Sequence, residues 1–182
     1  MSLPHRIAGD IALDLANTLA WRGTARETDP LMSADDIVTW AKEADLVDRS
    51  FDVAADENEI LLKRTLTLRS AIGAAGAAIA HGKDAPASAL NVIRDLAANA
   101  LLGAEVSGAP ATLKFTGIDK IIGAIAWSAL DLIRGDELSR LKQCPPDDCR
   151  WLFIDRTKNG SRRWCDMATC GNRAKKQGRR KG

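Results

Sequence analysis

Every cysteine of the 182-residue chain lies in one stretch, Cys144-Pro-Pro-Asp-Asp-Cys149-Arg-Trp-Leu-Phe-Ile-Asp-Arg-Thr-Lys-Asn-Gly-Ser-Arg-Arg-Trp-Cys165-Asp-Met-Ala-Thr-Cys170. The spacing is C-x4-C, then fifteen residues, then C-x4-C. Two close pairs separated by the length of a hairpin can surround one tetrahedral ion, and four thiolates suit the borderline-soft Zn²⁺. The spacing therefore predicts a closed structural zinc site with Cys144, Cys149, Cys165 and Cys170 as ligands.

Other uses of four cysteines fit less well. Paired disulfides need an oxidising compartment, and the N-terminus from Met1 to Asp10 lacks the apolar core of a signal peptide. Scattered buried cysteines would not fall in two matched pairs. An iron–sulfur cluster stays open as the other metal site. Four thiolates leave no open position for water, so we expect no catalytic zinc and no enzyme.

The two ends of the chain differ in charge. From Cys144 onward, eleven Lys or Arg face four Asp or Glu, a net charge of +7, whereas the first 143 residues carry fifteen against twenty, a net charge of −5. This asymmetry indicates a polyanion as partner of the cysteine-containing end. The longest apolar run, Ile121 to Ile133, contains Asp131 and is too short to span a membrane, so we expect a buried helix there and no membrane partner.

Hydrophobic periodicity predicts a mainly α fold with two parts, a multihelical domain over 1–140 and a zinc module over 141–182. A capping box, Ser33 to Asp36, marks the start of the second helix. The stretch between Glu105 and Thr116 alternates apolar and polar residues, which indicates a small half-buried hairpin. The helices are expected at Asp10 to Leu19, from Ser33, from Asp56 or Glu57 to Gly82, at Pro86 to Leu102 and, as the central one, at Ile118 to Ile133.

The zinc module itself should resemble a treble clef. Arg150 to Ile154 reads as a strand, Asn159-Gly160 as a hairpin turn, and the chain returns through Ser161 to Trp164 before a helix begins near Cys170. So small a unit cannot be stable by apolar burial alone, and the metal should contribute directly to its stability.

Basic residues follow the second cysteine pair and also occupy the hairpin. Each phosphate that such residues neutralise releases counterions, which gives salt-dependent binding to nucleic acid. The alternative is a solvated terminal tail without a partner. The candidate nucleic-acid contacts are Arg156, Lys158, Arg162, Arg163, Arg173, Lys175, Lys176, Arg179 and Arg180.

Three polar residues near the N-terminus are candidates for a ligand site: Asp14, Asn17 and Arg22. Asp14 and Asn17 interrupt the apolar face of the first helix, so they must find polar partners. The alternative is that they brace neighbouring backbone, which is the commoner role of buried polar side chains.

The run Cys170-Gly171-Asn172-Arg173, with Arg162-Arg163-Trp164-Cys165 before it, closely resembles the CGNR zinc-finger family. The match extends back to Cys144 over about forty residues. Leu13-Asp14-Leu15-Ala16-Asn17-Thr18, then Trp21-Arg22 and Trp40, resemble the opening of the ABATE domain that accompanies this finger. One departure is Thr157, where the family more often has Ser.

The resemblance implies a bacterial transcription regulator, described as stress-induced, with the four cysteines as zinc ligands and Arg173 as a basic contact. We therefore expect a cytoplasmic, nucleoid-associated DNA-binding protein whose helical domain senses a small-molecule effector or forms a homodimer. Two other functions stay open. The first is RNA binding, with Trp151, Phe153 or Trp164 stacking on bases. The second is a small-molecule-binding protein or enzyme with a purely structural zinc site.

Overall fold

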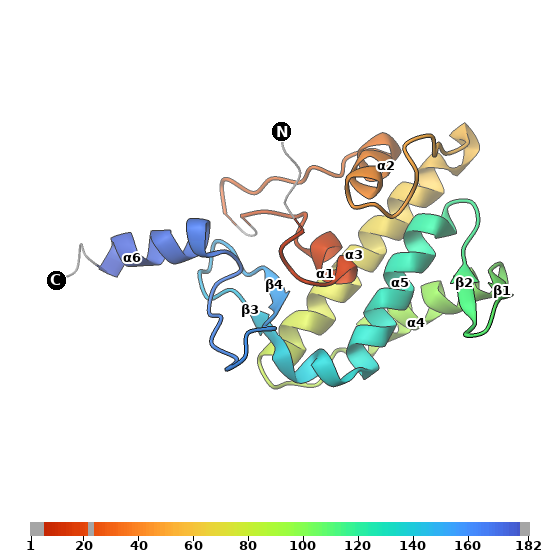
Figure 1. The fold of residues 1–182 in the computed structure, drawn as a ribbon. Coiled ribbons are helices and arrows are strands. Elements are labelled where there is room, and N and C mark those ends of the chain that lie inside the picture. The colour runs from red at the N-terminus through yellow and green to blue at the C-terminus, as the bar shows by residue number, and fades with distance from the viewer. Residues whose placement is uncertain (1–5, 22–23, 179–182) are drawn as a thin grey trace.

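The computed structural model describes residues 6–21 and 24–178 (Figure 1). Its order is α1 (Ile11–Ala16), α2 (Ala34–Glu43), a 3-10 turn (Ala55–Glu57), α3 (Asn58–Ala80), α4 (Ala87–Leu102), β1 (Glu105–Ser107), β2 (Thr112–Lys114) and α5 (Asp119–Arg134). A second 3-10 turn (Asp136–Arg140), β3 (Leu141–Gln143), β4 (Leu152–Ile154), a π-helical turn (Met167–Gly171) and α6 (Asn172–Gly178) follow. The prediction of a mainly helical N-terminal part followed by a hairpin and helix around the cysteines is confirmed.

Local sequence explains where the helices begin and end. Asp10 caps α1 by accepting hydrogen bonds from the Ala12 and Leu13 N–H groups. The capping box of α2 forms as expected, because the Ser33 and Asp36 side chains each accept from the other's backbone N–H. Gly82 takes the left-handed conformation after α3, with φ of 68°. α1 is shorter than predicted and ends at Ala16, and the next residue, Asn17, uses its side chain elsewhere.

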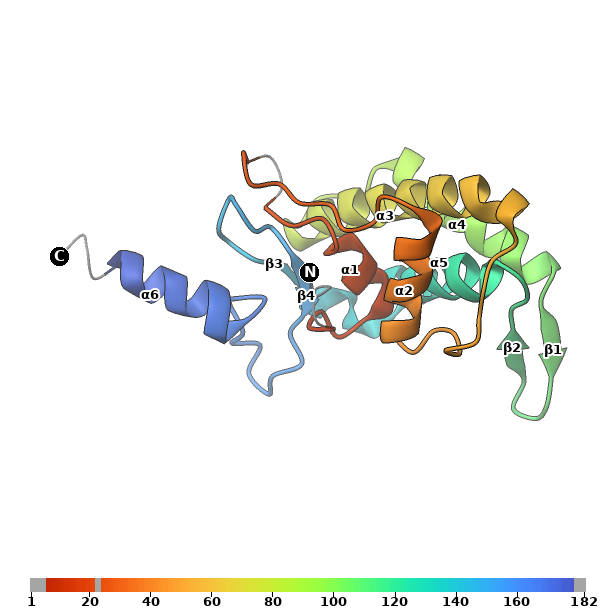
Figure 2. The ribbon, with the colours of Figure 1, turned by 90° about the horizontal axis from the view of Figure 1, so that it is seen from above.

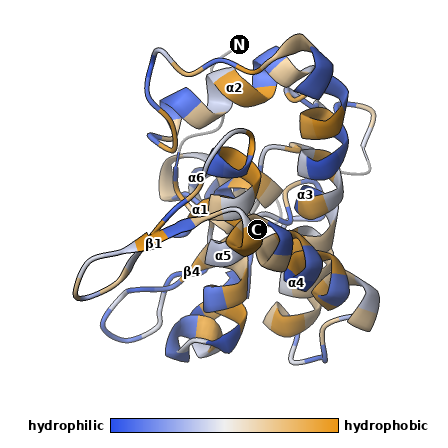
Figure 3. Ribbon diagram, turned by 90° about the vertical axis from the view of Figure 1, so that its right-hand side faces the viewer, coloured by the Kyte–Doolittle hydropathy of each residue, from blue (hydrophilic) through white to orange (hydrophobic). Residues whose placement is uncertain are grey.

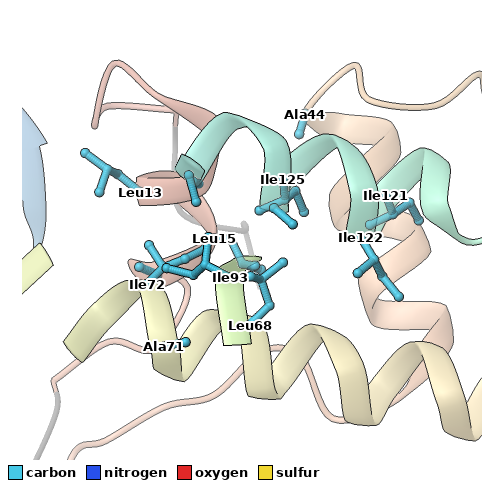
Figure 4. Packing of buried hydrophobic residues seen from close by; sticks show 14 of the residues in the cluster. Leu13, Leu15, Ala44, Leu68, Ala71, Ile72, Ile93, Ile121, Ile122 and Ile125 are labelled. Carbon is cyan, nitrogen blue, oxygen red and sulfur yellow. The ribbon is translucent and has the colours of Figure 1, made fainter. Parts of the chain in front are cut away.

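The hydrophobic core lies between α1, α3, α4 and α5. α5 packs on all three of the other helices, as expected of a buried helix, but it shares the central position with α3, which packs on the same helices and also on α2. Figure 4 shows Leu15 of α1, Leu68 of α3, Ile93 of α4 and Ile125 of α5 meeting in this core. Within the ranges described above, no helix is long and apolar enough to cross a membrane.

The two ends of the molecule carry different extensions. The β1–β2 hairpin projects at one end and α6 at the other (Figures 1 and 2). The hairpin pairs antiparallel with Val106 opposite Leu113, and Leu113 and Phe115 are half-buried between exposed neighbours, as the alternation predicted. Figure 3 shows hydrophobic and hydrophilic segments alternating along the helices.

Strand β4 has a different partner from the one expected. It pairs antiparallel with β3, Leu141 opposite Ile154 and Gln143 opposite Leu152, and the prediction of a partner strand after Asn159-Gly160 is wrong. The turn itself forms, with Gly160 at φ of 59°. The backbone after it leaves the ladder because the Arg162 N–H donates to the Asp155 side chain at 2.9 Å instead.

Strand β4 belongs to two cores at once. Successive side chains of a strand point to opposite faces; Leu152 and Ile154 join the helical core, and Phe153 between them joins the four cysteines. Gly76 of α3 allows the close approach, because a Cβ there would lie 2.5 Å from Leu152 Cδ1. The zinc module and the helical domain are therefore packed directly on each other.

Candidate metal centre

The four cysteines form one buried cluster. All four thiols are free, and their Sγ atoms lie within 4.8 Å of one another. Cys165 Sγ lies 3.6 Å from both Cys149 Sγ and Cys170 Sγ, far beyond the length of a disulfide bond at about 2.05 Å. Four sulfurs at about 2.3 Å from a tetrahedral Zn²⁺ are about 3.8 Å apart, so this cluster fits that ion.

Local backbone contacts hold each cysteine pair in place. The Cys144 N–H donates to the Trp151 carbonyl at 2.8 Å, and the Cys149 N–H to the Pro146 carbonyl at 2.9 Å. After the second pair begins, Asp166 caps the π-helical turn by accepting from the Thr169 N–H at 2.7 Å. The ligand positions are thus built by short turns at the two ends of the C-x4-C motifs.

The four thiols are so close together that they cannot all ionise without a bound cation. Hydrogen bonds from Cys149 and Cys165 lower the pKa of Cys144 to about 4. The thiols of Cys144 and Cys149 raise the pKa of Cys165, and burial raises the pKa of Cys170. One thiolate is therefore favoured at the expense of the others, and a divalent cation bound among them is what allows all four to ionise.

A buried carboxylate organises the loop between the cysteine pairs. Asp155 is fully buried. Burial alone would raise its pKa, but hydrogen bonds from Lys142 and Thr157 hold the pKa well below its usual range. Its oxygens accept from Lys142 Nζ at 2.6 Å, the Thr157 N–H at 3.0 Å, Thr157 Oγ1 at 2.5 Å and the Arg162 N–H at 2.9 Å.

The sequence analysis did not identify Lys142 as a residue of this site. Lys142 Nζ also donates to the Gly160 carbonyl at 2.5 Å and the Arg162 carbonyl at 3.2 Å, so it ties β3 to the loop. The signal for it was weak: a lone Lys two residues before Cys144 looks like any exposed lysine.

Two of the three candidate ligand residues contact backbone around β4. Asn17 exchanges hydrogen bonds with Leu152, donating from Nδ2 to the carbonyl at 2.8 Å and accepting at Oδ1 from the N–H at 2.8 Å. Asp14 Oδ1 accepts from the Ala8 N–H at 3.0 Å, and the Ala8 carbonyl accepts from the Ile154 N–H at 2.8 Å. Both residues thus fix β4 to α1. Arg22 lies outside the described residues.

The candidate nucleic-acid contacts fall into four groups. Four are exposed and, among the described residues, form no ion pair: Lys158, Arg163, Lys175 and Lys176. Arg156 makes a bidentate pair with Glu137, both distances 2.7 Å, and Arg173 pairs with Asp148 at 3.0 Å. Arg179 and Arg180 lie outside the described residues.

Arg162 differs from the other candidates, since its guanidinium turns into the protein. The guanidinium lies 4.4 Å from the centre of the Phe153 ring. Its N–H groups donate to the carbonyls of Trp164 at 3.1 Å, Ile7 at 3.0 Å, Ile154 at 3.4 Å and Cys165. These contacts join the start of the helical domain to both sides of the metal cluster.

Fold and site together define a helical protein with a four-cysteine zinc finger at its C-terminal end. Residues 140–181 match the CGNR zinc finger, and residues 9–136 match the ABATE family, described as "Putative stress-induced transcription regulator". The chain belongs to the ABATE family. No curated protein matches the chain. Both sequence resemblances are confirmed, and the buried cluster is consistent with a structural Zn²⁺.

Proposed function

We propose that this protein is a zinc-containing DNA-binding transcription regulator in which the C-terminal finger contacts DNA. The exposed cations of the finger carry this proposal. Among the residues that the structure describes, Lys158, Arg163, Lys175 and Lys176 form no ion pair. Free cations are available to phosphates, and α6 projects from the body of the molecule (Figure 2). The family description supports transcription regulation as the process.

The basic residues differ in whether their charge is free to bind a phosphate. We assign them to Lys158, Arg163, Lys175 and Lys176, with Arg179 and Arg180 continuing the basic run along the sequence. Arg156 and Arg162 are engaged within the protein, and we assign to them the role of holding the finger together.

Duplex DNA fits the aromatic residues better than single-stranded RNA. Base stacking needs an exposed ring face. Phe153 is fully buried beneath Arg162, and the Trp151 indole N–H donates to the Leu19 carbonyl at 3.3 Å. Trp151 and Trp164 are both half-buried, and the Arg163 guanidinium already lies over the Trp164 ring at 5.6 Å.

The helical domain offers a place for an effector. A hollow of about 690 Å³ lies between the end of α2, β2 and the start of α5. Its lining includes the apolar side chains of Leu46 and Phe115, and its charged lining residues are Lys42, Glu43, Asp45, Asp48, Arg49, Lys114 and Lys120. Charged groups of both signs beside a few apolar side chains can bind and orient a small charged molecule. We propose this hollow as the sensing site, and not the Asp14 and Asn17 pair.

The test is selection of bound sequences from random duplex DNA by the zinc-loaded protein, followed by fluorescence anisotropy of one selected duplex at increasing salt. The proposal expects enrichment of a sequence, log K falling linearly with log salt, and loss of binding when a chelator removes zinc. Competitor RNA in the same assay tests the RNA alternative, because RNA that displaces the duplex more strongly than DNA does would favour it. Sedimentation of the same sample measures whether the protein is a dimer. No salt-dependent shift of any duplex would refute DNA binding.

A further inference from the structure

Arg173, the second residue of α6, makes three contacts at once. Its Nη1 donates to Asp148 Oδ2 at 3.0 Å, and its Nη2 lies 3.4 Å from the sulfur of the ligand Cys170. Its guanidinium carbon lies 4.9 Å from the centre of the Trp21 ring. Its side chain is 27% exposed, so the contacts form a partly buried set.

Trp21 belongs to the helical domain and not to the finger. It lies at the start of a loop closed by the bridge between Ala20 and Thr28. A second guanidinium, that of Arg26, lies 4.3 Å from its ring centre, and Arg26 Nη2 lies 3.7 Å from Asp148 Oδ2. One indole ring and one carboxylate thus join two arginines from opposite parts of the chain.

The backbone conformation of Trp21 is one that neighbouring groups must stabilise. Trp21 has φ of 55°, in the left-handed region that a bulky residue other than Gly rarely adopts. Such a conformation persists only where the surrounding structure stabilises it. Here it places the ring against Arg173.

A phosphate contact through Arg173 would have to compete with these partners. Arginine donates no more than five hydrogen bonds, and here its two terminal nitrogens already serve Asp148 and Cys170. Hydrogen bonds to a metal ligand keep it oriented, and removing such a partner typically weakens metal binding about 10–100-fold. Lys175 and Lys176, by contrast, are exposed without an ion pair among the described residues.

We propose that Arg173 is a positioning residue, and that through the chain Trp21, Arg173 and Cys170 the helical domain fixes the start of α6 and shields the fourth zinc ligand. Events in the helical domain that move Trp21 then change both the orientation of the basic helix and the rate of zinc loss. The statement about orientation rests on the DNA-binding function proposed above, whereas the statement about zinc does not.

The zinc arm of the test measures how fast a colorimetric chelator takes the metal from the full chain. Arg173→Ala and Trp21→Ala should each speed zinc loss roughly 10-fold or more, and the double variant should be no faster than the faster single one, because both remove the same contact. Lys176→Ala is the matched control on the same helix and should match the wild type. If Trp21→Ala also matches the wild type, or if the two effects multiply, the proposal is overturned.

The DNA arm uses anisotropy with the selected duplex. Trp21→Ala removes no charge, yet it should lower affinity together with Arg173→Ala, again without additivity. An unchanged affinity for Trp21→Ala would leave Arg173 as an ordinary phosphate contact. If the wild type binds no DNA, the proposed function is refuted. The rates of zinc loss still test whether Arg173 is a positioning residue. Should Arg173→Ala not fold, Arg173→Lys serves instead, since it keeps the charge but loses the planar fork that reaches both partners; zinc loss at the wild-type rate in that variant would contradict the proposal.

Discussion

The side-chain amide of Asn17 pairs with the backbone of Leu152 as a neighbouring strand would, with one hydrogen bond in each direction at 2.8 Å. The two residues are 135 positions apart, and Asn17 is 3% exposed. A single side chain at the end of α1 therefore completes the edge of the strand that covers the metal cluster.

Replacing this side chain should destabilise the protein. Asn17→Ala leaves the Leu152 N–H and carbonyl buried without partners, at about 1–3 kcal/mol for each group. We expect the free energy of unfolding in urea to fall by roughly 3 kcal/mol, measured by circular dichroism of the zinc-loaded protein. Asn91→Ala makes the same chemical change at an exposed position of α4 and should shift stability by a few tenths of a kcal/mol only. Equal effects of the two changes would mean that the Asn17 pairing contributes nothing.

Removal of the metal should lower the thermal stability of the helical domain. Cys170→Ser, or a chelator, should release zinc and unfold the finger, so Leu152 and Ile154 leave the helical core. Burial of each such side chain contributes about 1.5–3 kcal/mol, so the helices should persist but melt roughly 10 °C lower. Zinc content and thermal unfolding followed at a helical wavelength check this. Met167→Leu, at an exposed position between the last two ligands, is the control. If the melting temperature of the helices is the same with and without zinc, the helical core and the cysteine cluster are independent in stability.

The exposed lysines of α6 should set the salt dependence of DNA binding. Lys175→Ala with Lys176→Ala should lower affinity and reduce the slope of log K against log salt by about two, without changing zinc content. Lys63→Ala with Lys83→Ala removes the same charge from exposed positions of the helical domain and should leave the slope unchanged. The reverse ranking would place the DNA on the helical domain.

The ion pair between Arg69 and Asp29 should make stability depend on pH. Burial alone would raise the pKa of Asp29, but hydrogen bonds from Arg69 and the Leu31 N–H lower it below its usual value. A lowered pKa in the folded state stabilises the protein above about pH 4, and this contribution is lost as the pH falls through the folded-state pKa.

Asp29→Asn should therefore cost about 2 kcal/mol at neutral pH, because it leaves buried Arg69 without its anion. The difference from the wild type should shrink as the pH falls below about 4. Urea unfolding of both proteins at several pH values measures it, and the acid sensitivity of the zinc site cancels in the comparison. A difference that stays constant with pH would contradict the assignment.

Local signals in the sequence were sufficient for much of the fold. The capping box at Ser33, the left-handed Gly82 and the alternation around Leu113 each depend on residues within a few positions. The spacing of the cysteines was enough for the metal cluster, because one short turn lies within each pair.

Contacts between segments that are distant in the sequence could not be predicted from local patterns. Nothing near Arg162 distinguishes it from exposed Arg163, since its inward position depends on carbonyls from Ile7 and Ile154. The partner of β4 was missed because Asn159-Gly160 is a strong turn signal, whereas β3 is three residues long and follows directly on a 3-10 turn. Short strands of this kind are specified by the groups that cover them.

The alternation of Leu152, Phe153 and Ile154 also limits protein engineering. A finger cut out at residue 141 and grafted onto another protein would present Leu152 and Ile154 to water and lose the amide of Asn17. Such a chimera should aggregate through this apolar edge unless α1 and α3 travel with the graft. We therefore expect the zinc finger not to fold when it is separated from α1 and α3, so a shorter protein for tests of DNA binding should be made by trimming the hairpin end of the helical domain.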